Sequence, residues 1–154
     1  MLFYPPTVVI RHRLEKLKKC SLRGLETRSD FKFLTYPYTQ LPDLTNYILL
    51  TLDAPPLTVA DLASGLLVLD ATWRYASKML TPFLKRTDLI PRSLPPGYLT
   101  AYPRCQLDCP QPGRGLSSVE AIYISYHLLK RDPNSLLDHY YWKDKFLQIN
   151  AFIH

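Results

Sequence analysis

The sequence predicts an α/β domain in which helices flank a mostly parallel sheet. Short apolar and β-branched runs recur along the chain and alternate with segments of helical periodicity, which is the pattern of this fold class. One run, Leu66–Leu69, is apolar at every position, as strands covered on both faces are. The length of 154 residues fits a single domain, covering residues 1–154.

The first half of the chain contains four candidate strands, each of which ends at a turn signal or a polar residue. They are Thr7–Ile10, Phe31–Thr35, Tyr47–Leu52 and Leu66–Leu69. Between the first two, apolar or small residues recur at helical spacing and predict a basic, weakly amphipathic helix or half-helix. These residues are Leu14, Leu17, Ser21 and Leu25.

The second half is expected to be more helical. Thr72 opens a helix that we expect Pro82 to interrupt, and one face of this helix carries Trp73, Ala76, Met79 and Leu80. Short strands are expected near Arg92–Leu94 and Tyr98–Ala101.

The C-terminal part is expected to contain two helices. Ser117 and Glu120 have the spacing of a capping box and predict a helix that stops before Pro133. A last helix is expected over Ser135–Phe152, which is rich in leucine and aromatic residues.

The composition excludes several classes of protein. Hydrophobic residues make up 47% of the chain and charged residues 21%, so the chain is not disordered. No uncharged apolar run approaches the ~18 residues of a membrane span. Residues 1–11 lack the basic start of a signal peptide, so we expect a cytoplasmic protein with no membrane partner. Cys105 and Cys109 form a CxxxC pair without a second pair, so we expect no metal.

The charge is unevenly distributed. The chain carries a net charge of +6, and residues 11–28 alone contain seven basic and two acidic side chains. A basic stripe of this kind is typical of a phosphate-bearing partner. The alternative is a solvated basic helix without a partner. The candidate RNA-binding residues are Arg11, Arg13, Lys16, Lys18, Lys19 and Arg23.

Parallel sheets bind ligands beyond the carboxyl ends of their strands. This rule draws attention to Tyr36-Pro37, to Asp70 and to the loop after Ala101. The carboxylate of Asp70 could face a ligand, and Trp73 offers a flat wall for a base; alternatively, Asp70 caps the following helix and Trp73 is core. The sequence contains no GxGxxG, Walker, GxSxG or HExxH motif, which leaves the corresponding nucleotide, hydrolase and zinc chemistries without a signal.

Five short blocks resemble those of one superfamily, and two of them are specific. The run LVLDATW, residues 67–73, resembles the D-x-T-W signature of DTW-domain proteins. The run LSSVEA, residues 116–121, is similar to their LSTxEA block and to the LSCVEA block of small-subunit rRNA aminocarboxypropyltransferases.

The other three blocks are shorter. His12 and Glu15 resemble an HPxE block, Lys19-Cys20-Ser21 a KCT block, and the run LTYP, residues 34–37, an LYP or LSP strand end. All five occur in family order over residues 7–130.

The resemblance implies a SPOUT-like knotted α/β fold that binds S-adenosylmethionine. It also implies transfer of the 3-amino-3-carboxypropyl (acp) group to uridine in RNA, in tRNA for the DTW branch and in small-subunit rRNA for the other; we expect tRNA first and rRNA next. The sequence departs from the rRNA branch after Ala101, where Tyr102-Pro103-Arg104 replaces the asparagine-containing loop. The cysteine-rich segment of many DTW proteins is absent, so zinc is not implied.

The resemblance also assigns the cofactor site. Asp70 would pair with the ammonium or the ribose of the donor, and Ser21 would hold its carboxylate. Glu120 would lie near the donor or the target, and either acid could accept the proton from uridine. Thr35, Pro37 and Trp73 would form the slot for adenine, backbone groups of Leu99, Ala101 and Leu116 would bind its edge, and Ser117 would also belong to the cofactor site.

Two other function classes stay open at the level of sequence. One is a SPOUT-class RNA methyltransferase, which uses the same cofactor but exposes its methyl group. The other is a non-catalytic RNA-binding protein with a degenerate pocket.

Overall fold

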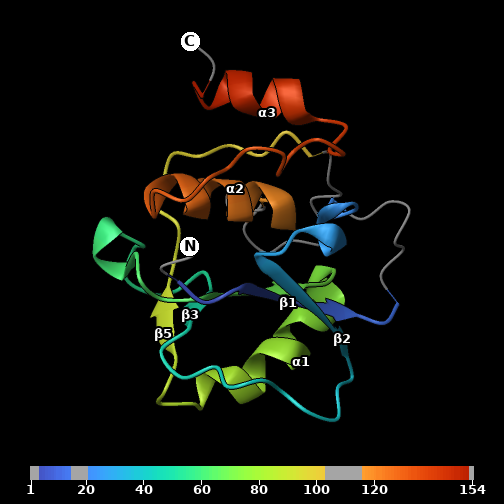
Figure 1. The fold of residues 1–154 in the computed structure, drawn as a ribbon, viewed down its shortest axis with the longest axis vertical. Helices are drawn as coiled ribbons and strands as arrows, with labels where there is room; N and C mark the ends of the chain where they lie inside the picture. The colour runs from blue at the N-terminus through green and yellow to red at the C-terminus, as the bar shows by residue number, and fades with distance from the viewer. Residues whose placement is uncertain (1–3, 15–20, 103–115, 153–154) are drawn as a thin grey trace.

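The computed structural model describes residues 4–14, 21–102 and 116–152, and it does not describe the side chains of residues 73 and 74. The chain forms three layers (Figure 1). A parallel sheet lies in the middle, helix α1 (Trp73–Leu84) covers one face, and helix α2 (Ser118–Leu128) covers the other. The short helix α3 (Lys143–Ile149) lies beyond α2, on the side away from the sheet.

The sheet has five strands in the order β2-β1-β4-β3-β5, and neighbouring strands pair in parallel. The predicted α/β class with a parallel sheet and flanking helices is therefore confirmed. The knot stays a prediction, and residues 103–115 lie outside the described part of the chain. The strands are β1 (Thr7–His12), β2 (Phe31–Tyr36), β3 (Ile48–Leu50), β4 (Leu66–Asp70) and β5 (Ile90–Arg92).

Alternation along the central strands builds two cores. Val9 of β1 and Val68 of β4 point to the α2 side, where they join Ile122 in one buried cluster. Ile10 and Leu67 point to the α1 side and pack in a second cluster with residues of α1. Because successive strand residues face opposite sides, the polar residues at the ends of these strands also point to one face or the other according to their position.

The chain changes direction between β1 and β4. The connection from β1 leads outward to β2, whereas α1 carries the chain from β4 past β3 to β5. The chain therefore leaves β1 toward one edge of the sheet and leaves its neighbour β4 toward the other edge. Such a topological switch point is where open parallel sheets bind ligands, at the carboxyl ends of the strands.

Several predicted boundaries are wrong. Pro82 lies inside α1, close enough to its end at Leu84 that few backbone bonds are affected. The segment 98–101 is not a strand, because side chains rather than a neighbouring strand bond its backbone. The third predicted strand narrows to Ile48–Leu50, and the strand predicted at Arg92–Leu94 is β5, Ile90–Arg92.

Two further predicted helices differ from the structure in the part of the chain that it describes. Of the predicted C-terminal helix, only Lys143–Ile149 is α-helical, after a run of turns. The basic helix predicted after β1 is, within its described part, a turn and a 3-10 helix at Leu25–Thr27. Gly24 precedes that 3-10 helix with φ of 92°, and a Cβ atom there would collide with the His139 ring. Only glycine fits this turn.

A buried polar cluster closes the amino edge of the sheet. The hydroxyl groups of Thr7 and Tyr126 lie 2.7 Å apart, and Tyr126 donates to Asp30 Oδ2 at 3.2 Å. Arg28 donates to both oxygens of Asp30, at 2.8 and 2.9 Å. Helix α2 is thus bonded to the starts of β1 and β2.

We expect Tyr126→Phe to lower the free energy of unfolding by about 1–3 kcal/mol, because it removes a hydroxyl that two buried groups bond. Urea denaturation followed by circular dichroism measures the change. Tyr123→Phe is the matched control, since its hydroxyl makes no hydrogen bond among the described residues and the change should be nearly neutral. Equal effects of the two changes would contradict a role for the hydroxyl.

The same residue sets a pH dependence. Burial, the largest cause, raises the pKa of Tyr126 above the ordinary tyrosine value of 10.0. In the unfolded chain this phenol therefore loses its proton first, so stability is retained below pH 10 and falls as the pH rises further. We expect the fall above about pH 10 to be less steep in Tyr126→Phe, as urea denaturation at a series of pH values would measure.

Candidate active site

Three strands end side by side at the switch point. The register pairs Arg11 with Thr35 of β2 on one side and with Asp70 of β4 on the other. Two residues before each of them, Val9, Phe33 and Val68 pack on the α2 side of the sheet. Strand alternation therefore directs all three side chains toward the layer of α2, at the carboxyl edge of the sheet.

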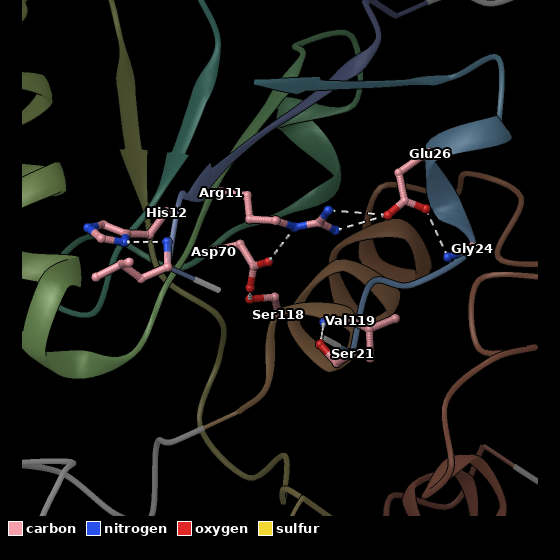
Figure 2. Close-up of polar contacts among 9 residues, drawn as sticks. Arg11, His12, Ser21, Gly24, Glu26, Asp70, Ser118 and Val119 are labelled. Atoms are coloured by element: carbon pink, nitrogen blue, oxygen red, sulfur yellow. Dashed lines mark hydrogen bonds and ion pairs between the residues drawn. The ribbon is translucent and has the colours of Figure 1, made fainter. Parts of the chain in front are cut away.

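Asp70 is the best-defined member of this group. It is the last residue of β4 and is 5% exposed. Ser118 Oγ donates to Asp70 Oδ1 at 2.7 Å, and Arg11 Nε donates to Oδ2 at 3.3 Å (Figure 2). The alternative that Asp70 caps the following helix is wrong, because Thr72 occupies the N-cap position of α1. Asp70 instead joins the end of β4 to the first turn of α2.

The charge pattern predicts that Arg11 binds RNA, and the structure corrects this prediction. The Arg11 side chain is buried, with 9% exposure of the residue, and lies over the ring of Phe33 at 4.8 Å from the centroid. Nη1 and Nη2 each lie 3.2 Å from Glu26 Oε1, while Nε faces Asp70. The number of basic residues in a segment does not show which of them are buried in a strand, as Arg11 is, and which are exposed after it, as Arg13 is.

The turn that contains Ser21 is attached to the same place. Glu26 Oε2 accepts the Gly24 N–H at 2.9 Å, and Ser21 Oγ accepts the Val119 N–H at 3.3 Å (Figure 2). Burial raises the pKa of Glu26, but hydrogen bonds from its own backbone, from Gly24 and from Arg11 outweigh it, so the pKa is lowered. Glu26 is therefore held as a carboxylate that binds Arg11.

Glu120 has a different role from the one predicted. It is fully buried, and its two oxygens accept hydrogen bonds from four donors. The predicted capping box with Ser117 is confirmed. Because its oxygens are enclosed in this way, Glu120 is unsuited to be a proton acceptor for an RNA base. The donors are Thr100 Oγ1 at 2.6 Å, the Ala101 N–H at 2.8 Å, the Ser117 N–H at 2.8 Å and Tyr140 OH at 3.0 Å.

The backbone predicted to bind adenine is largely occupied. The Ala101 N–H bonds Glu120, and the Leu99 N–H and C=O pair with the Asn150 side-chain amide at 2.7 and 2.8 Å. The side chain of Leu99 is exposed. The Leu99 N–H and the Ala101 N–H are therefore not open to adenine, and a contact from the other backbone groups of residues 99–101 and 116 stays a prediction.

The other predicted residues differ in exposure, and some of them are not described by the structure. Thr35, Pro37, Arg13 and Arg23 are exposed, whereas Leu116 is half-buried and Ser117 is buried at the N-cap of α2. Lys16, Lys18 and Lys19 lie outside the described residues. Trp73 is the first residue of α1, and its side chain is not described, so its contact with adenine stays a prediction.

Sequence reasoning misses four partners of the site. Ser118 lies inside the LSSVEA block, where its position next to the capping serine is the available signal. Glu26, Tyr140 and Asn150 carry no signal, because they approach the site only through folding.

No group of His, Cys, Asp and Glu side chains suited to a metal occurs among the described residues, and all three cysteines lie outside them. Of the helices described, none has the length and apolar character needed to cross a membrane.

Comparison with known proteins supports the fold class. No protein-family model matches the chain, and no curated protein does. A solved structure does match, the SAM-dependent rRNA:acp-transferase Tsr3 from Vulcanisaeta distributa, with a TM-score of 0.69 and 24% sequence identity. The match covers 96% of this chain and 79% of that one. The chain therefore shares the α/β fold of that enzyme over nearly its whole length.

We expect Glu120→Gln to destabilise the protein by about 1–3 kcal/mol, because an amide group would then face hydrogen-bond donors in a buried place. Urea denaturation measures the change. Asp144→Asn removes an exposed carboxylate from the first turn of α3 and serves as the control, with an expected effect within about 0.5 kcal/mol. Wild-type stability in Glu120→Gln would contradict the structural role of this carboxylate.

Proposed function

We propose that this protein transfers the acp group of S-adenosylmethionine to uridine in RNA. One observation carries the proposal: the carboxylate of Asp70, in the run LVLDATW, lies at the switch point of a fold shared with Tsr3. That neighbour is named as an S-adenosylmethionine-dependent rRNA acp transferase.

The residues at the carboxyl edge suit such a cofactor. Thr35 and Pro37 are exposed at the end of β2, on the strand next to Arg11, and Asp70 ends the strand on the other side. We assign Thr35, Pro37 and Trp73 to the adenine, and Asp70 to the ammonium or ribose. Ser21 uses its oxygen to accept a backbone bond, and its O–H can donate to the carboxylate of the donor.

The cofactor supplies a carbon that is already activated by the sulfonium, so the main task of the protein is positioning. Asp70 is the better candidate for the proton acceptor, because Glu120 is enclosed by four donors. Asp70 also lies at the strand end where parallel sheets bind ligands, whereas Glu120 is directed at the 100–101 segment.

The similarity to Tsr3 bears on which class of RNA is the substrate. The family resemblance favours tRNA, but the rRNA named as the substrate of Tsr3 supports rRNA as the first substrate to test. Arg13 and Arg23 are exposed and, with Lys16, Lys18 and Lys19, remain the proposed RNA contacts. These side chains would bind phosphates and fix position rather than read sequence.

The test uses purified protein, S-adenosylmethionine labelled in either the methyl group or the carboxypropyl carbons, and RNA separated by size class. Carboxypropyl label in RNA together with methylthioadenosine supports the proposal. Methyl label in RNA together with S-adenosylhomocysteine would make the protein a methyltransferase. Absence of cofactor binding would favour the non-catalytic RNA-binding alternative.

We expect Asp70→Asn to lower stability, because Asp70 is buried and ion-paired, and to reduce the cofactor affinity or rate of the folded protein about ten- to a hundred-fold. A charge-assisted contact is worth roughly 1.5–3 kcal/mol, and about 1.4 kcal/mol corresponds to one decade. Calorimetric titration and the label assay measure the two quantities. Asp30→Asn is the control, because Asp30 is a buried, ion-paired carboxylate at the opposite edge of the sheet. It should lower stability and leave the cofactor affinity of the folded protein unchanged. Full activity of Asp70→Asn would remove Asp70 from the site.

The basic side chains in the segment after β1 should make RNA binding weaker as the salt concentration rises. Replacing Arg13, Lys16 and Lys19 by alanine should weaken RNA binding and flatten its salt dependence by roughly 0.7–0.9 in slope for each phosphate that is no longer bound. Filter binding at several salt concentrations measures the slope. The control replaces Lys130, Lys143 and Lys145, which removes the same charge from the α2 and α3 end of the chain and should change the slope less. A larger change of slope in the control variant would place the RNA at the α2 and α3 end of the protein.

A further inference from the structure

We propose that Arg11 is a positioning residue that holds Asp70 and the turn of residues 21–27 in the arrangement that binds the cofactor. This role rests on the proposed function. It places Arg11 inside the site, in contrast to the RNA contact that the charge pattern predicts.

The guanidinium of Arg11 bonds two separate segments. Nε donates to Asp70 Oδ2 at 3.3 Å, while Nη1 and Nη2 converge on Glu26 Oε1 at 3.2 Å (Figure 2). One side chain on β1 therefore bonds the end of β4 and the 3-10 helix that follows Ser21. These two segments have no covalent connection near this point, so the planar fork sets their separation.

The two carboxylates in turn hold the start of α2. Glu26 accepts the Gly24 N–H and fixes the turn whose Ser21 oxygen accepts the Val119 N–H. Asp70 accepts the hydroxyl of Ser118 from the same first turn of α2. The bonds from Arg11 thus reach α2 by two routes, and both routes pass through residues assigned to the cofactor.

Burial separates Arg11 from the RNA surface. Its guanidinium stacks on Phe33 in a buried position, whereas Arg13, two residues further on, is exposed. A guanidinium with both ends bonded to carboxylates has little capacity left for a phosphate. Its replacement should therefore change cofactor binding in the absence of RNA.

Lysine is the informative replacement. It keeps the positive charge but has a single ammonium, which cannot bond Asp70 and Glu26 with the geometry of the fork. The matched control is Arg28→Lys, since Arg28 is half-buried, bonds Asp30 with two nitrogens and lies at the amino edge of the same sheet.

The experiment measures S-adenosylmethionine affinity by calorimetry in the absence of RNA, and stability by urea denaturation. Arg11→Lys should weaken cofactor binding roughly two- to a hundred-fold, the range that couplings within one network span. Arg28→Lys should lower stability and leave the cofactor affinity unchanged. In the Asp70→Asn background, Arg11→Lys should add less than its full effect, because the two residues act together.

A cofactor affinity in Arg11→Lys equal to that of wild type would overturn the inference, as would full additivity with Asp70→Asn. Failure of wild type to bind the cofactor would instead overturn the proposed function. If Arg11→Lys does not fold, Glu26→Ala carries the test, because Glu26 is exposed and its removal releases the distal end of Arg11. Unchanged affinity in Glu26→Ala would then overturn the inference.

Discussion

A buried carboxylate must be matched by hydrogen-bond donors or positive charge, and the structure around α2 depends on this constraint. Asp70 and Glu120 both bond the start of this helix or lie in it, and each collects donors from distant parts of the chain. Glu120 gathers neutral donors and fixes the 100–101 segment, whereas Asp70 has a cationic partner in Arg11. The two acids, which sequence alone cannot tell apart as proton acceptors, thus acquire separate roles through their partners.

The contrast between these acids bears on how the proposed transfer reaction could work. Positioning an activated donor requires rigid walls more than reactive groups. Glu120 supplies rigidity, since its four bonds tie α2 to Tyr140 and to the segment that follows β5. Asp70 ends a strand at the switch point, and its ion pair with Arg11 fixes the orientation of its carboxylate there.

Much of the fold can be predicted from the sequence, and the parts that cannot share a physical cause. The strands that begin at residues 7, 31 and 66 are visible because β-branched or continuous apolar runs report burial directly. The capping box at Ser117 and the strand end at Asp70 are visible because their chemistry is local or follows a general rule of parallel sheets. That Arg11 points inward toward this acid requires the register between β1 and β4, which no local pattern contains. The turns of residues 135–142 are missed because Leu136, Leu137 and Tyr140 are buried in the α2 core without helical geometry.

The order of the strands has a consequence for how the chain acquires this site during synthesis. The central strand β1 is made first, but Asp70 follows Arg11 by 59 residues, and the Thr7 hydroxyl meets Tyr126 only across 119 residues. Contacts this distant in sequence form late and slow the folding of parallel sheets. A nascent chain that has emerged only through β2 can pair two strands, but the carboxylate of Asp70 is not yet accessible to Arg11. The proposed cofactor site is therefore a property of the finished chain, and on the ribosome the Nε group of this arginine should remain hydrated until β4 has emerged.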